Sequence, residues 1–280
     1  MSLIKWIKAS RSGSVVPVEG APTVDPMPAH TGIWLDRCVL VEPDSQEHPH
    51  RQKLHSLAMR SLAAGAPARR NYEERLRLLR AEAEVADPLG VKRRVFEVKT
   101  RTRLLLHPAT GSTVTEGGLL LHHTYGVPYL PGSALKGLCR RRVAGFADLP
   151  FDADKLFGSA EESGTAAERS FVDFWDALWV PDGAASPLVE DIVNPHHAGY
   201  YTKQESRPAP SDGDAPQLTH FLTVGPGTKF MVVIEVPSSE EDTKAKRLLD
   251  WIERVLLDGL AEDGIGARTR SGYGVLSQAT

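Results

Sequence analysis

The feature that most constrains the fold is an alternation of strand-like and helix-like segments in the second half of the chain. Between Val95 and Leu106, polar and apolar residues alternate with the period of two that a half-buried strand requires. Residues 133–146 and 239–260 instead carry apolar stripes at helical spacing. Further strands are expected over residues 118–122, 171–180, 229–236 and 273–276. This order predicts an α+β fold in which helices cover a sheet of short strands.

The strand expected over 95–106 has two chemically different faces. One face is apolar, whereas the other presents Lys99, Arg101 and Arg103. Such a row of cations is usually a solvated face, but it is also how a strand presents itself to phosphates. Combined with the order of helices and strands, the pattern predicts a ferredoxin-like α+β sandwich with insertions.

The front of the chain has a different character. Residues 1–30 are rich in Ser, Pro and Gly and have no periodicity, so we expect an extended arm. A short strand is expected over 33–41. The pattern becomes helical over 51–63 and 71–86, and Asp87-Pro88 ends the second helix.

These patterns predict two regions. Residues 1–91 form an N-terminal extension with a helical insertion, packed on the core. Residues 92–280 form the ferredoxin-like core. Within the core, residues 199–216 are too polar and too rich in proline to pack, which predicts a long surface loop.

Composition excludes several classes of protein. The 280 residues are 41% hydrophobic and 25% charged, which permits a buried core and excludes wholesale disorder. No window of about 18 uninterrupted apolar residues occurs, so no membrane partner is expected. The first residues also lack the apolar stretch of a secretory signal. Cys38 and Cys139 have no metal-ligand spacing, so we expect reduced thiols, a cytoplasmic location, and no metal or cofactor.

Charge is distributed unevenly along the chain. Residues 51–107 hold 14 Lys and Arg against 6 Asp and Glu, whereas residues 148–263 hold 9 against 23. A basic front half and an acidic back half favour one surface that faces a polyanion and another that faces basic protein or solvent. Alternatively, folding mixes these segments and the dipole disappears.

The C-terminal segment GIGARTRSGYG, residues 264–274, is the most unusual motif. Its glycines surround Arg268, Thr269 and Arg270. Glycines allow bare N–H groups to approach a ligand, and arginines add bidentate phosphate contacts. The segment follows a helix and leads into a strand, which is the reverse of a dinucleotide-binding fingerprint. The alternative is a Gly-rich turn with two solvent-exposed arginines.

A second motif is GVPYLPGSALKGLCRRR, residues 126–142. We expect Ser133 to be the N-cap of a helix, with Lys136 in its first turn and Arg140 on its outer face. A helix start with a hydroxyl cap and a lysine is a generic anion site. The simpler interpretation is a capped helix with a basic outer face.

These motifs resemble the RAMP superfamily, the repeat-associated proteins of CRISPR effector complexes. Its hallmarks are a Pro-Gly-Ser-x-Leu-Lys-Gly helix start, a Leu-Phe-Gly-Ser segment and a C-terminal Gly-rich loop. They correspond here to Pro131 to Gly137, Leu156 to Ser159, and Gly264 to Gly274. The finer resemblance, over residues 92–280, is to the family of sixth subunits of the type III-B (Cmr) effector complex. One departure is His107 to Gly111, where the family often has a Gly-rich turn.

The resemblance implies a non-catalytic, RNA-binding structural subunit with an RRM-like fold, active in antiviral defence. Such a subunit grips the backbone of the guide (CRISPR) RNA near its 3′ end, packs against other Cmr complex subunits, and can meet target RNA. Carried over residue by residue, the implied phosphate contacts are Ser133, Lys136 and Arg140 at the helix start, and Gly266, Arg268, Thr269 and Arg270 in the loop. The strand alternation adds Lys99, Arg101 and Arg103.

Two other functions stay open. Some RAMP relatives are metal-independent ribonucleases that process guide RNA precursor with a His and a Tyr or Lys. The candidates here are His122, His123, His196, His197, Tyr200 and Tyr201. Adjacent histidines on an extended chain point to opposite faces, which disfavours both an acid–base couple and a chelated metal. The other alternative is an assembly protein that touches no RNA and docks through the acidic region 148–263.

Overall fold

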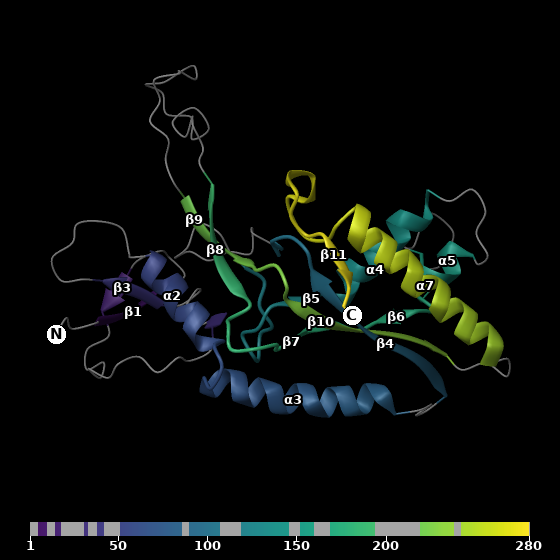
Figure 1. Ribbon diagram of the computed structural model, residues 1–280, viewed down its shortest axis with the longest axis horizontal. Helices are drawn as coiled ribbons and strands as arrows, with labels where there is room; N and C mark the ends of the chain where they lie inside the picture. Colours follow the sequence, from purple (N-terminus) through teal and green to yellow (C-terminus); the bar gives the residue numbers. More distant parts are fainter. Residues whose placement is uncertain are drawn as a thin grey trace, which may run out of the picture.

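The structure is a computed structural model, and it describes the following residues: 5–9, 15–17, 31–32, 38–41, 51–85, 90–106, 119–145, 152–159, 169–193, 219–237 and 242–279. These residues form helices and antiparallel sheets (Figure 1). The expected α+β class is therefore confirmed.

The main sheet has the strand order β11-β4-β10-β7-β5, and β6 pairs separately with β10. Its longest strands, β4 and β10, pair antiparallel from Lys229↔Lys99 to Pro237↔Val91. The strands are β4 (Val91–Thr100), β5 (Tyr129–Leu130), β6 (Asp173–Phe174), β7 (Ala177–Val180), β10 (Lys229–Pro237) and β11 (Leu276–Gln278).

Helices α4 (Gly132–Val143) and α7 (Asp242–Glu262) lie against one face of this sheet (Figure 1). The apolar stripe of α7 and alternate residues of β4 and β10 form a common core with α4. Its fully buried members include Val98, Leu135, Phe230, Ile234, Ile252 and Leu256. The short helix α5 (Ala153–Phe157) follows α4 and is capped by the side chain of Asp152. Among the described residues, no helix is long and apolar enough to cross a membrane.

Helix α3 (Pro67–Glu84) lies on the other side of the sheet, below it in Figure 1. Tyr72 is fully buried there; its ring stacks on Trp179 with 5.7 Å between centroids, and its hydroxyl donates to the Trp179 carbonyl. Arg80 of α3 forms an ion pair with Glu97 of β4. The sheet face that was expected to be wet and cationic is thus partly covered by a helix.

The remaining elements form two smaller sheets. Strands β8 (Leu188–Val193) and β9 (Thr219–Val224) make an antiparallel pair, and helix α2 (Arg51–Ser61) docks on it through His55, whose Nδ1 lies 2.8 Å from Glu190 Oε1. The front of the chain contributes a three-stranded sheet of β1 (Lys5–Ala9), β2 (Val15–Pro17) and β3 (Cys38–Val41). The expected long loop, 199–216, lies outside the described residues.

The strand expected over 95–106 was wrong at both ends, because β4 starts at Val91 and stops at Thr100. Thr100 is tied to the β9–β10 turn: its hydroxyl donates to Gly225 O at 2.8 Å and accepts from Thr228 N–H at 2.9 Å. The chain therefore leaves the sheet, and Leu104 forms only an isolated bridge with Val224.

Three other expected strands also differ. The strand expected over 171–180 is split into β6 and β7, and the closing strand begins at Leu276 rather than at Tyr273. Of the strand expected over 118–122, the described part shows only an isolated bridge between Leu121 and Pro128.

Candidate nucleic-acid interface

The C-terminal Gly-rich loop closes onto the segment that follows β4. Gly274 N–H donates to Arg103 O, Ala267 N–H to Leu105 O, and Arg101 N–H to Val275 O, each at 2.8 Å. Segments 101–105 and 264–275 therefore lie side by side, and we call their exposed and half-buried residues the loop surface. It brings the arginines of two separate sequence motifs together.

Two glycines make this closure possible. Gly274 has φ +75°, and a Cβ atom there would lie 2.0 Å from Ile265 O. Gly266 has φ +90°, and its Cβ would lie 2.5 Å from Leu105 O. These two glycines are needed for contacts within the protein, a role that the sequence pattern did not predict.

Arg268 is the one non-glycine residue with positive φ among the described residues, at 58°. Its guanidinium lies 5.4 Å from the centre of the Phe221 ring, a cation–π contact that holds the side chain over β9. Within the described part of the chain, the N–H groups of Gly266, Arg268, Thr269 and Arg270 have no hydrogen-bond partner. They are available to an external acceptor, as the motif predicts.

The arginines of the loop surface differ in their partners. Arg103 Nη1 lies 3.0 Å from Asp191 Oδ1, and the Tyr273 hydroxyl donates to Asp191 Oδ2 at 2.7 Å. This hydrogen bond, aided by burial, raises the pKa of Tyr273. Arg101 and Arg270 are exposed, and their side chains have no partner among the described residues. Arg101 and Arg270 are therefore free to meet phosphates, whereas Arg103 is already paired.

Lys99 does not belong to this surface. It lies on β4, half-buried, on the sheet face that α3 partly covers. There it is close to Asp182, whose pKa is lowered mainly by a hydrogen bond with Lys229 and to a smaller extent by Lys99. The predicted row of Lys99, Arg101 and Arg103 along one strand was wrong, because the strand ends between the first and the second of them.

The start of α4 differs from the prediction. Pro131, not Ser133, is the N-cap residue, and Gly132 N–H donates to Asp176 Oδ1 at 2.8 Å. A Cβ at position 132 would lie 2.1 Å from Phe174 O, so Gly132 permits close packing against the turn between β6 and β7. Ser133 is exposed in the first turn. A carboxylate at this helix end disfavours a phosphate there.

The other basic residues of α4 form a second, separate group. Lys136 is half-buried, and Arg140 Nη2 lies 3.5 Å from Asp154 Oδ1 of α5. Arg142 pairs with Glu262 and Asp263 at the end of α7. Among the described residues, no hydrogen bond or ion pair joins Ser133, Lys136 or Arg140 to the loop surface. The predicted RNA-contacting residues therefore lie in three parts of the structure: the loop surface, helix α4 and, for Lys99, strand β4.

Folding also mixes the basic and acidic halves of the chain. Cations from the basic half pair with acids from the acidic half in Arg93–Glu235, Arg94–Asp250, Arg94–Glu253 and Arg103–Asp191. Many charges are therefore neutralised locally, which favours the mixed alternative over a molecule-wide dipole.

The histidines proposed for the ribonuclease alternative are only partly described. His122 Nδ1 accepts from Thr124 N–H at 3.2 Å, and its ring lies 4.8 Å from that of Tyr125 and 5.6 Å from that of Tyr129. His123 is exposed. His196, His197, Tyr200 and Tyr201 lie outside the described residues. Within the described ranges, no group of three or more His, Cys, Asp or Glu is arranged to hold a metal ion.

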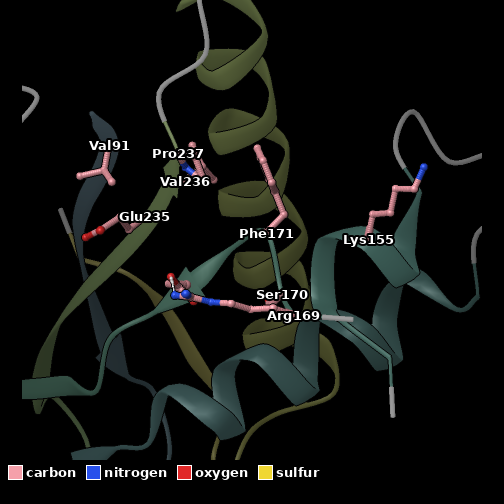
Figure 2. A pocket seen from close by; sticks show the side chains of 9 residues that line it. Val91, Lys155, Arg169, Ser170, Phe171, Glu235, Val236 and Pro237 are labelled. Carbon is pink, nitrogen blue, oxygen red and sulfur yellow. Dashed lines mark hydrogen bonds and ion pairs between the residues drawn. The ribbon is translucent and has the colours of Figure 1, made fainter. Parts of the chain in front are cut away.

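A hollow of about 700 Å³ lies at the end of the sheet where β10 finishes and β4 begins (Figure 2). Val91, Phe171, Val236 and Pro237 give it apolar walls. Figure 2 shows Lys155 on α5 and the Arg169 side chain extending away from α5. The Arg169 guanidinium lies 3.5 Å from Asp173. The hollow contains none of the predicted RNA-contacting residues.

Comparison with known proteins identifies the class. Residues 88–277 match the sequence model of the RAMP superfamily (RAMPs), so the chain belongs to that superfamily. It is similar to the CRISPR system Cmr subunit Cmr6 of Pyrococcus furiosus, with 29% identity over 64% of this chain and 66% of that protein. It is also similar to the CRISPR system CMR subunit Cmr6 of Saccharolobus solfataricus, with 30% identity over 64% of this chain and 55% of that protein.

The chain spans less than two thirds of the length of both relatives. In the cryo-EM structure of the Type III-B Cmr-beta bound to cognate target RNA, one chain aligns with 82% of this chain and 71% of its own length. Its TM-score is 0.59 and its identity is 24%, which shows likeness of fold. The resemblance drawn from the three motifs is confirmed.

Proposed function

We propose that this protein is a non-catalytic structural subunit of a type III-B (Cmr) ribonucleoprotein that binds the backbone of the guide RNA near its 3′ end. The observation that carries the proposal is the loop surface, where backbone hydrogen bonds join the segments that carry Arg101, Arg268 and Arg270. Four N–H groups of this surface have no partner among the described residues. Arginines and N–H groups are the usual ligands of RNA phosphates, and such contacts are independent of sequence. The second proposed contact consists of the side chains of Ser133, Lys136 and Arg140 on α4, and it does not use the helix N-terminus, where Gly132 N–H is already bonded to Asp176.

We also infer that the core is ferredoxin-like. In the sheet order β11-β4-β10-β7, the four strands occupy the places that the fourth, first, third and second strands occupy in a βαββαβ unit. Helix α4 lies between the first and second of these strands in sequence, and α7 between the third and fourth. The other strands and the N-terminal helices are then insertions and extensions.

The proposed partners follow from the relatives. Other Cmr subunits would be neighbours, guide RNA the main ligand and target RNA a second one, in a cytoplasmic antiviral complex. Because its contacts go to phosphates, the isolated protein should bind RNA weakly and without sequence preference. Assembly along one guide would supply the affinity through effective concentration.

Binding of the purified protein to labelled single-stranded RNA, with the same samples run on a denaturing gel, tests this function. We expect binding with the RNA left intact. Cleavage that persists in a metal chelator and disappears in His122→Ala or His123→Ala would instead identify a ribonuclease. Complete absence of RNA binding would leave only an assembly role.

A further inference from the structure

Among the described residues, the first half of β4 is unpaired on the side opposite β10. Strand β10 pairs with β4 along its whole length, but β11 reaches only Thr100, Lys99 and Val98, followed by a last bond from Ala279 N–H to Glu97 O at 2.9 Å. Beyond that bond, no described segment pairs with this side of β4. Within the described part of the chain, this edge is therefore open from Val91 to Val95.

The register shows which backbone groups the open edge presents. In an antiparallel ladder, alternate residues direct both their N–H and C=O groups to the same side. Because Glu97 bonds toward β11, the groups of Val91, Arg93 and Val95 also point to that side, away from β10. None of these groups has a hydrogen-bond partner in the described part of the chain. Unpaired strand edges of this kind can accept another strand.

A cationic groove runs beside this edge. A hollow of about 450 Å³ between β4 and α7 is lined by Lys92, Arg93, Arg94, Thr243, Lys246 and Leu249. Four of these residues are cations and none is acidic, although the guanidinium of Arg93 lies on the α3 side, where Nη1 donates to Glu82 O at 2.8 Å. Arg93 and Arg94 already have acidic partners, but Lys246 is exposed, and the described residues offer it no ion pair. On the opposite side of the edge, Val85 at the end of α3 is 51% exposed.

We propose that this edge is a docking site for an extended acidic segment of a partner protein, which adds a strand beside β4. A polypeptide strand satisfies both the donors and the acceptors of the edge, whereas RNA phosphates would pair with the N–H groups and repel the carbonyls. Two copies of this chain would bring their cationic grooves together, so self-pairing is disfavoured. Along the incoming strand, acidic side chains that face α7 alternate with apolar side chains that face Val85 and α3.

The test uses the full-length protein and a labelled peptide, acetyl-Glu-Val-Glu-Val-Glu-Val-Glu-amide, with a twin in which Lys replaces Glu. We expect saturable binding of the acidic peptide, no binding of its twin, and slower amide hydrogen exchange confined to residues 91–95. Lys246→Glu weakens the binding about fivefold, because the exposed charge opposite the peptide is reversed. Arg60→Glu on α2 makes the same change of charge elsewhere and leaves binding unchanged.

A second variant separates strand addition from simple charge attraction. Val95→Pro removes an N–H group that only the edge uses, and proline is tolerated on such edges. It abolishes peptide binding, whereas Val95→Thr keeps the N–H group and binds as the unmodified protein does. The proposal is overturned if the acidic peptide does not bind, if both peptides bind equally, if residues 91–95 gain no protection, or if Lys246→Glu binds normally.

Discussion

At the scale of single residues, the glycines of the loop surface illustrate what sequence reasoning can and cannot supply. The motif predicted backbone freedom at residues 264–274, and the structure shows positive φ at each of its glycines. The motif could not predict which of these glycines lie too close to neighbouring atoms to carry a Cβ atom. Gly274 lies against Ile265, but Gly272 has nothing within 4 Å of a Cβ position. That difference depends on tertiary packing.

Replacing these two glycines by alanine separates crowding from backbone strain. Gly272→Ala introduces only the strain of positive φ and should lower the free energy of unfolding by about 1 kcal/mol. Gly274→Ala adds a collision with the Ile265 carbonyl and should cost at least about 3 kcal/mol. Chemical denaturation measures both values. Equal losses would show that the loop does not close as described.

The burial of Cys139 predicts how the free energy of unfolding depends on pH. The thiol is buried, and burial raises its pKa from the ordinary 9.0 to about 12. The unfolded chain then releases a proton that the folded protein keeps, so this residue's contribution to stability is complete below pH 9 and is lost as the pH rises toward 12. The difference in unfolding free energy between the unmodified protein and Cys139→Ala should shrink by about 1.4 kcal/mol per pH unit there. A constant difference would contradict this burial.

At the scale of elements, Tyr72 is the fully buried side chain through which α3 contacts the sheet. Tyr72→Phe removes one buried hydrogen bond, leaves the Trp179 carbonyl unpaired, and should cost about 1 to 3 kcal/mol. Tyr72→Ala also removes the stacked ring and leaves a cavity, so we expect a loss of about 3 to 5 kcal/mol. Equilibrium unfolding compares the two variants. If alanine is no worse than phenylalanine, the stacking does not stabilise the docked helix.

The elements also show how far the sequence could be interpreted. Helices α2, α3 and α4 and strand β10 were predicted close to their observed bounds, because local periodicity decides them. The end of β4 could not be predicted, since it depends on hydrogen bonds from Thr100 to residues 225 and 228. The predicted N-cap of α4 was wrong for the same reason. The start of this helix depends on a hydrogen bond from Gly132 to Asp176, which lies 44 residues away in sequence.

At the scale of the whole molecule, a net charge of −3 does not prevent RNA binding. Ion pairs neutralise several arginines of the basic half. On the loop surface, Arg101 and Arg270 are exposed and have no side-chain partner among the described residues. The functional candidates were found by motif, but their assembly into one surface required the fold. We propose that the loop surface binds RNA phosphates.

The most direct test is the affinity for labelled single-stranded RNA across a salt series. In Arg101→Ala/Arg270→Ala, we expect weaker binding and a slope of log K against log salt that is smaller by about 0.7 for each phosphate that the variant no longer neutralises. The matched variant Arg60→Ala/Arg75→Ala removes two exposed arginines from α2 and α3 and should keep both the affinity and the slope. If the loop-surface variant and the matched variant bind RNA equally, with equal slopes, the loop surface does not bind the RNA backbone.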